Sequence, residues 1–286
     1  MTFKKKLSIL NNYVKSNITK SKILLYKNKV NFIKTDKIKN HGYLYIAFKK
    51  NFLDEAILSA LSLKQNTKKK IAIFTDIKDE RLNKVFDFIG IINPSNIRSK
   101  VDFISKSPFK KTVYLDSDTF IKNNIDDIFE ILNYFDVVGC IDSARKRKYI
   151  SDKISEYAKI PYGFSEINGG VLAFKSNKKV NFFLEIWKKK FFKYLKETSG
   201  WDQPSLRIAL WNSKVKLHIL PPEYNVRSKE VINKIKKIKK KLGPEHMQDR
   251  ILHMHYSRNI HNGNFKVKNL KELEKKISKK KISINF

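Results

Sequence analysis

The sequence predicts an α/β protein, a single domain in which helices flank a mostly parallel central sheet. Residues 43–48 form a short apolar run, residues 51–64 place apolar side chains close to helical spacing, and residues 70–76 form a second apolar run. Strands that are apolar throughout are typical of parallel sheets whose two faces are both covered by helices. With 286 residues, 41% of them hydrophobic, the chain is long enough to bury such a core.

The same alternation continues along the chain. Further strands are predicted at residues 111–116, 135–142, 169–174, 215–220 and 251–255, and further helices at residues 125–132, 178–196 and 202–211. Residues 85–92 fit a strand or a short helix, and residues 101–105 fit the end of a helix or a strand. Since no repeat or linker interrupts the pattern, we expect an N-terminal extension over residues 1–40, the main domain over residues 41–260 and a basic tail over residues 261–286.

The chain is strongly basic, with 61 Lys and Arg residues against 27 Asp and Glu residues and a net charge of +34. Such a charge attracts polyanions, among them nucleic acid and anionic lipid headgroups. Lysine far outnumbers arginine, and the lysines are spread along the whole chain rather than gathered in one block. This distribution favours a compositional origin of the charge over a specific nucleic-acid role, with attraction to a membrane surface as a secondary consequence.

Cys140 is the only cysteine, so no intrachain disulfide can form, which fits a reducing compartment. No apolar run approaches the roughly 20 residues that a membrane-spanning helix needs. The apolar residues 7–10 are too few for the core of a signal peptide. We therefore expect a cytoplasmic protein, in peripheral contact with the inner membrane face at most.

Two carboxylates stand at the end of the predicted strand 111–116, in the segment Asp116-Ser117-Asp118. In extended geometry residues i and i+2 point to the same side, roughly 7 Å apart, and a slight turn brings both onto one cation. Ligands of open α/β sheets bind beyond the carboxyl ends of strands, and hard oxygen ligands suit Mg²⁺ or Mn²⁺. An Asx turn is the alternative interpretation, and because an isolated pair of this kind is common, it is the preceding apolar strand that strengthens the metal interpretation.

Two other short motifs carry polar groups that can bind a ligand. In Asn168-Gly169-Gly170 the glycines permit close approach of the backbone and the amide can bond a hydroxyl, although a plain tight turn explains the motif equally. Asp202 and Gln203 open a helix, where a carboxylate and an amide can bind hydroxyls or where Asp202 serves only as an N-cap. Taken alone, each motif favours the structural interpretation.

His253 and His255 face the same side of the last predicted strand. One core and one surface histidine is the usual explanation for such a pair. With a carboxylate pair elsewhere in the chain, however, one imidazole can complete a metal site.

These four features, in this order, resemble glycosyltransferases of the GT-A fold, particularly family 8 and its bacterial relatives. The resemblance covers about residues 42–258, and the matching stretches are residues 45–48, 73–76, 107–119, 167–174, 202–206 and 251–253. There is one departure. Family 8 enzymes usually carry a glycine-containing stretch after the histidine, with a lysine that touches the diphosphate. Here Met254-His255-Tyr256-Ser257-Arg258 follows instead, so Arg258 or His255 would substitute for that lysine.

The resemblance implies a role for each motif. Asp116, Asp118 and His253, with His255 as the rival third ligand, would hold Mn²⁺ or Mg²⁺. Ala47, Phe48 and Asp76 would line the nucleoside pocket, and Arg98 or Lys100 would meet the donor phosphate or ribose. Asp142, Asn168 and Gln203 would contact the transferred sugar, with Asp202 beside it. The implied donor-binding residues are Ala47, Phe48, Asp76, Arg98, Lys100, Asp116, Ser117, Asp142, Asn168, Gly169, Gly170 and Arg258.

The implied function is transfer of a hexose-type sugar from a nucleoside diphosphate, UDP by family default, to an acceptor hydroxyl. The metal and basic side chains would stabilise the leaving diphosphate, and the acceptor would be a glycan, lipid-linked or protein hydroxyl in glycan or surface polysaccharide biosynthesis. Asp202 and Gln203 are the catalytic candidates. A family 8-like enzyme retains configuration, which we expect here, whereas an inverting enzyme would use Asp202 as its base.

Two other classes of function stay open. A nucleotidyltransferase acting on sugar phosphates needs a glycine-rich phosphate loop near the first strand, and residues 48–51 contain no glycine. A non-catalytic, basic nucleic-acid-binding protein needs no carboxylate pair. The lysine-rich residues 234–241 are interpreted as a solvated helix face, with a lid over the donor phosphates or a membrane contact as alternatives.

Overall fold

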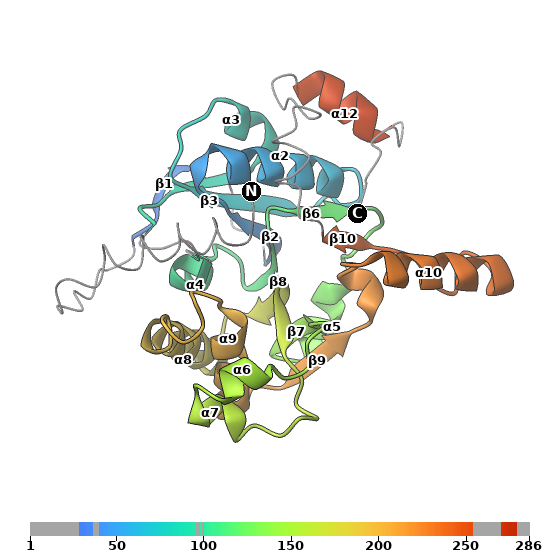
Figure 1. Cartoon of the computed structure of the whole chain (residues 1–286). Helices are drawn as coiled ribbons and strands as arrows, with labels where there is room; N and C mark the ends of the chain where they lie inside the picture. The colour runs from blue at the N-terminus through green and yellow to red at the C-terminus, as the bar shows by residue number, and fades with distance from the viewer. Residues whose placement is uncertain (1–28, 37–39, 95–97, 99, 254–269, 279–286) are drawn as a thin grey trace.

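The large sheet of the protein has eight strands in the order β1-β4-β3-β2-β5-β8-β7-β9 (Figure 1). The computed structural model describes residues 29–36, 40–94, 98, 100–253 and 270–278. The strands are β1 Asn31–Lys34, β2 His41–Ile46, β3 Lys70–Thr75, β4 Phe88–Ile91, β5 Lys111–Leu115, β7 Val137–Ile141, β8 Ile167–Lys175 and β9 Leu217–Leu220. A separate two-stranded sheet pairs β6 Thr119–Ile121 with β10 Ile251–His253.

Four of the seven pairings in the large sheet are parallel, which confirms the predicted mostly parallel α/β architecture. The exceptions are the edge strand β1, which runs antiparallel to β4, and β8, which runs antiparallel to both β5 and β7. The reversed direction of β8 brings its first residues to the carboxyl end of β5. It thereby places the Asn168-Gly169-Gly170 motif beside Asp116.

Helices cover both faces of the sheet (Figure 1). The longer ones are α2 Lys49–Lys64, α5 Ile128–Tyr134, α8 Lys178–Lys193, α9 Gln203–Ser213, α10 Lys229–Leu242 and α12 Leu270–Ser278. The short ones are α3 Arg81–Val85, α4 Lys100–Phe103, α6 Lys148–Ser151 and α7 Ser155–Ala158, with 3₁₀ turns at Ile104–Lys106 and Pro222–Tyr224. Residues 85–92 therefore hold the end of a helix followed by a strand, and residues 101–105 belong to a helix and a 3₁₀ turn.

Alternate residues of each central strand enter two different cores. In β2, Tyr43 and Tyr45 pack with α2 on one face, whereas Leu44 and Ile46 pack with α8 and α9 on the other. All four side chains are buried, as are their neighbours in β3. This two-sided burial is the physical reason that these strands carry no alternation of polar and apolar residues.

The lysine-rich stretch 234–241 lies in α10, whose first half packs Val231, Ile232 and Ile235 against the core. Most of its lysines are exposed, as the interpretation as a solvated helix face requires. The second half extends away from the body of the molecule (Figure 1). Within residues 261–286, helix α12 contacts α2 and buries Ile277, so part of this basic segment packs on the domain. No described helix has the length and apolar character to cross a membrane.

Candidate metal and nucleotide-sugar site

Asp116-Ser117-Asp118 forms a tight turn between β5 and β6. The backbone N–H of Asp116 donates to the carbonyl of Gly170 (2.8 Å), which extends the pairing of β5 with β8 by one bond. At the other end of the turn, the hydroxyl and the N–H of Thr119 both donate to the carbonyl of Asp116 (2.9 and 3.2 Å). The turn is thus anchored at both ends, and it presents two carboxylates beyond the end of a buried strand.

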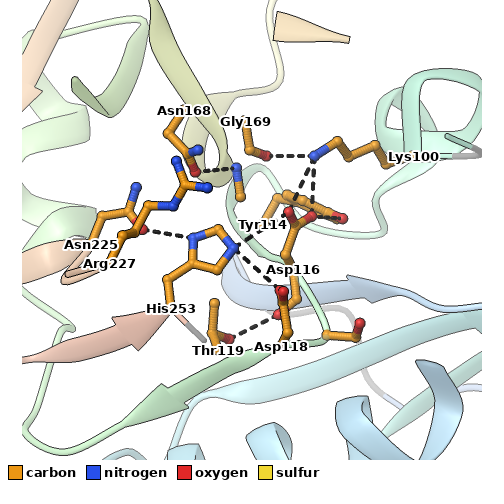
Figure 2. Close-up of polar contacts among 12 residues, drawn as sticks. Lys100, Tyr114, Asp116, Asp118, Thr119, Asn168, Gly169, Asn225, Arg227 and His253 are labelled. Carbon is orange, nitrogen blue, oxygen red and sulfur yellow. Dashed lines mark hydrogen bonds and ion pairs between the residues drawn. The ribbon is translucent and has the colours of Figure 1, made fainter. Parts of the chain in front are cut away.

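The antiparallel pairing of β6 with β10 brings a histidine to this turn. His253 lies opposite Thr119 in the register, and its Nε2 atom is 3.2 Å from Oδ1 of Asp118 and 3.8 Å from Oδ2 of Asp116 (Figure 2). One ligand atom from each of the three residues lies within 4.8 Å of the others. The three side chains that the sequence suggested as a metal site therefore converge.

The ring of His253 is held from behind by Asn225, because Nδ1 lies 2.7 Å from the amide oxygen Oδ1 (Figure 2). With the amide in this orientation the oxygen accepts, so Nδ1 carries the hydrogen and the Nε2 lone pair points at two carboxylates. That arrangement is repulsive unless a proton or a cation lies between these groups, and a cation there would be held by all three residues. A partner that fixes the tautomer of a histidine is typical of metal ligands, so the residues present fit a divalent cation.

Both glycines of the Asn168-Gly169-Gly170 motif lie against close neighbours, and the contacts are severe at Gly170 and tight at Gly169. A Cβ atom on Gly170 would lie 2.2 Å from Cε1 of His253 and 2.7 Å from Oδ2 of Asp116. A Cβ atom on Gly169 would lie 3.0 Å from Oδ2 of Asp202 and 3.3 Å from Nζ of Lys100. The glycines therefore make room for the charged groups of the site, and this is more than a plain turn would need.

Lys100, at the start of α4, lies at the centre of this arrangement. Its ammonium is 3.1 Å from each of Oδ1 of Asp116, the carbonyl oxygen of Gly169 and Oδ2 of Asp202. Burial by itself would lower the pKa of Lys100, but Asp116 and Asp202 outweigh burial and the pKa is raised. Lys100 is therefore a permanent buried cation that holds the two carboxylates together, and its contact with a donor stays a prediction.

Asp202 is buried and lies between two cations. Burial works to raise its pKa, but Lys100 and then Arg98 outweigh burial and hold the pKa below the usual value. The Nε atom of Arg98 is 3.7 Å from Oδ1 of Asp202, and the arginine side chain is partly exposed. Asp202 is thus an ionised, paired carboxylate at the start of α9, and its side chain makes no N-cap hydrogen bond.

A second cluster is centred on Asp142, which directly follows β7. Its carboxylate accepts from Nδ2 of Asn168 (3.1 Å), Nε2 of Gln203 (2.7 Å) and NH1 of Arg227 (2.7 Å). It also accepts from the N–H of Ala144 (3.0 Å) and from NH2 of Arg147 (2.9 Å). Burial would raise the pKa of Asp142, but these donors outweigh it and the pKa is lowered. The three predicted sugar-contact residues are thus side by side.

The predicted nucleoside-pocket residues also lie together, at the carboxyl ends of β2 and β3. The N–H of Ala47 donates to Phe74 (2.9 Å), and Oδ1 of Asp76 accepts from the N–H of Lys49 (2.9 Å). Phe48 stands between them, half-buried, with its ring 5.6 Å from that of Phe52. Because β2 pairs with β5 in parallel, these residues and the Asp116 turn follow neighbouring strand ends. Their role toward a nucleoside stays a prediction.

Tyr114, Glu55 and Asn225 lie at the site but were not foreseen from the sequence, whereas Ser117 was. Tyr114 donates its hydroxyl to Oδ1 of Asp116 (2.7 Å), and Ser117 donates to Oε2 of Glu55 (3.1 Å). Glu55 is buried in α2, and burial together with the charge of Asp118 raises its pKa to about 8. A carboxylate among apolar residues of a predicted helix is a signal that could have revealed Glu55. Asn225 carries no comparable signal.

Two residues of the predicted site, His255 and Arg258, lie outside the described residues. Of the two histidines predicted as the third ligand, the structure describes only His253, so the choice between them stays a prediction. Arg258 stays a predicted donor contact.

Comparison with known proteins identifies a family and a fold. A family model for nucleotide-diphospho-sugar transferases matches residues 110–270, which include the Asp116 turn, Asn168, Asp202 and His253. No curated protein matches the sequence.

Two solved structures show the same fold. The galactosyltransferase LgtC, solved with donor and acceptor sugar analogues, is 14% identical, with a TM-score of 0.51 over 75% of this chain and 87% of that chain. The bifunctional glycosyltransferase WbbM is 14% identical, with a TM-score of 0.52 over 77% of this chain and 46% of that chain. At this identity the likeness shows the GT-A fold alone, but the family model spans more than half of the sequence. The chain belongs to the nucleotide-diphospho-sugar transferase family.

Proposed function

We propose that the protein is a metal-dependent glycosyltransferase that moves a hexose-type sugar from a nucleoside diphosphate, UDP by expectation, to an acceptor hydroxyl. The convergence of Asp116, Asp118 and Nε2 of His253 is the observation that carries this proposal. Two carboxylates and an imidazole would hold Mn²⁺ or Mg²⁺, and the imidazole favours Mn²⁺ because Mg²⁺ binds mainly oxygen ligands. In this proposal the catalytic domain is built on residues 41–260.

The metal, when bound, would offset the negative charge that develops on the leaving diphosphate. On the sugar side, Nε2 of Gln203 is committed to Asp142. The carbonyl end of the Gln203 amide is therefore the part left to accept from a sugar hydroxyl or to face positive charge on the sugar. Asp142 holds this amide, and Asn168 donates to the same carboxylate oxygen of Asp142.

The surroundings of Asp202 support retention of configuration. A general base needs an accessible carboxylate with a pKa near the working pH. Asp202 is buried, paired with Lys100 and lowered in pKa, so it is a poor proton acceptor. A retaining enzyme needs no such base. In this proposal Asp202 positions Lys100 and the start of α9, and Gln203 contacts the sugar. The acceptor is a glycan, lipid-linked or protein hydroxyl, as the family resemblance implies.

The test is a thermal-shift screen of nucleotide sugars with and without Mn²⁺, followed by an assay of nucleoside diphosphate release. We expect one class of nucleotide sugar to raise the melting temperature only when Mn²⁺ is present. Chelation with EDTA should stop diphosphate release, and added Mn²⁺ should restore it. Release of pyrophosphate from a nucleoside triphosphate and a sugar 1-phosphate would instead identify a nucleotidyltransferase.

A further inference from the structure

Two arginines donate to the same carboxylate of Asp142, but their surroundings differ. Arg147 also donates to Glu166 (2.9 Å) and lies over the ring of Trp201, with its Cζ atom 5.0 Å from the ring centre. Arg227 donates from NH1 to Asp142 (2.7 Å), and its side chain is 30% exposed. Within the part of the chain that the structure describes, its Nε and NH2 groups have no hydrogen-bond partner. Arg227 therefore keeps donors that Arg147 has already used.

Arg227 also lies between the two clusters of the site. Its segment runs beside β10, where the N–H of Val226 donates to Ile251 (2.9 Å) and the N–H of His253 donates to the carbonyl of Val226 (2.8 Å). The preceding residue, Asn225, holds the imidazole of His253, while the side chain of Arg227 reaches Asp142. Figure 2 shows the guanidinium extending past the His253 ring toward Asn168.

The two clusters meet at Gly170. A Cβ atom there would lie 2.2 Å from Cε1 of His253 and 3.0 Å from Oδ1 of Asn168, so the imidazole and the amide approach the same point. In a bound nucleotide sugar, the diphosphate would lie between the metal and the transferred sugar. Its phosphates would therefore occupy the space between the His253 cluster and the Asp142 cluster, which is the space that Arg227 crosses.

Charge balance points to the same residue. A divalent cation would offset Asp116 and Asp118, and the diphosphate would then add further negative charge. Lys100 is enclosed by Asp116, Asp202 and the Gly169 carbonyl. Arg227 has donors to spare on the Asp142 side of the site, and a guanidinium is the side chain best matched to phosphate oxygens in a two-point contact.

We propose that Arg227 binds the donor diphosphate, with NH1 on Asp142 and its remaining N–H groups on phosphate oxygens. The inference rests on the proposed function, since it assumes a nucleoside diphosphate at this site. It assigns to a described residue the cationic contact that the family resemblance gives to Arg258 or His255. Asp142 would then orient the guanidinium and so connect sugar recognition to the leaving group.

The test uses Mn²⁺ with inorganic pyrophosphate as the probe, because this pair needs neither the donor base nor the sugar to be known. Isothermal titration of the full-length protein would compare the natural chain with Arg227→Met, Arg227→Gln and the matched control Arg147→Met. We expect Arg227→Met to weaken pyrophosphate binding roughly 10- to 100-fold, as loss of charge-assisted bonds predicts. Mn²⁺ affinity should change little, and Arg147→Met should keep the affinity for pyrophosphate.

Both arginines neutralise Asp142. If Arg227 acted only through that carboxylate, Arg227→Met and Arg147→Met would lose the same amount of pyrophosphate affinity. Equal losses, or unchanged pyrophosphate affinity in Arg227→Met, would overturn the inference. If Arg227→Met fails to fold, Arg227→Gln decides, since it keeps a donor for Asp142 and removes the charge. A natural chain that binds neither Mn²⁺-pyrophosphate nor any nucleoside diphosphate would instead remove the proposed function.

Discussion

Nδ1 of His253 lies 2.7 Å from Oδ1 of Asn225, on the side of the ring away from Asp116 and Asp118. This contact leaves Nε2 as the nitrogen available to a metal. Replacing Asn225 by alanine removes the acceptor that fixes the tautomer, and we expect Mn²⁺ affinity to fall roughly 10- to 100-fold. Asn225→Asp keeps an acceptor and should bind Mn²⁺ about as tightly as the natural chain. Titration of Mn²⁺ followed by electron paramagnetic resonance measures both, and natural affinity in Asn225→Ala would contradict the assignment.

Asp118→Asn should abolish metal-dependent transfer while the protein stays folded. Asn keeps the shape of the side chain but removes the charge that a divalent cation needs, and Asp118 lies at the surface of the cluster rather than in the core. Circular dichroism checks the fold, and release of nucleoside diphosphate checks activity. Full activity of this variant in the presence of EDTA would rule out the metal assignment.

Gly170→Ala should disrupt the metal site without unfolding the domain. The added methyl group would meet Cε1 of His253 at 2.2 Å, so the imidazole would have to move away from the carboxylates. We expect at least a tenfold loss of Mn²⁺ affinity. Gly163→Ala is the matched control, because a Cβ atom there has no neighbour within 4 Å. Equal Mn²⁺ affinity in the two variants would contradict this prediction, because it would mean that His253 can move away from the added methyl group and still bind the metal.

Lys100→Met should lower the free energy of unfolding by about 3–5 kcal/mol, because it removes the buried cation that Asp116 and the buried Asp202 share. The double variant Lys100→Met/Asp202→Asn removes one of the uncompensated charges and should recover part of the loss. Urea unfolding of both variants measures the difference. A loss below about 1 kcal/mol in the single variant would mean that solvent reaches these carboxylates.

The raised pKa of Glu55 predicts a pH dependence of stability. The unfolded carboxyl titrates near its model value of 4.5, whereas burial and Asp118 raise the folded pKa to about 8. The folded state thus holds the proton more tightly. The stability that protonated Glu55 contributes to the folded state is therefore complete below pH 4.5 and is lost as the pH rises through 8.

Glu55→Gln should therefore match the natural chain near pH 4.5 and exceed its stability above pH 8, by roughly 1–3 kcal/mol. Thermal or urea unfolding in EDTA, which keeps metal out of the neighbouring site, measures this difference across the pH range. A constant difference at all pH values would mean that Glu55 ionises normally.

The central strands could be predicted because two-sided burial leaves a direct mark in the sequence, as in residues 43–48. The direction of β8 could not be predicted, because an apolar run has the same composition whichever way the strand runs. Short elements such as β6 and α6 could not be predicted either, because they contain too few residues to show the spacing of apolar side chains that marks a strand or a helix. At the site, Asp116, Asn168 and Asp202 belong to recognisable motifs, whereas Asn225 acts through a contact with a residue 28 positions away.

Lys100 shows a further limit of sequence interpretation. A lysine near a predicted phosphate site is naturally assigned to the ligand. In the structure the ammonium of Lys100 contacts Asp116, Asp202 and the Gly169 carbonyl, so Lys100 neutralises carboxylates of the protein itself. Only the packed arrangement of α4, β5 and β8 distinguishes these two roles.

The pairing of β6 with β10 gives the site a consequence for folding. The two carboxylates precede β6 and the imidazole ends β10, so a cation bound by all three would tie together segments that are remote along the chain. Because the complete set of ligands exists only in the folded chain, a bound cation would stabilise the folded state over the unfolded one. A preparation treated with chelator and one loaded with Mn²⁺ would then differ in resistance to heat and to proteases as well as in catalysis.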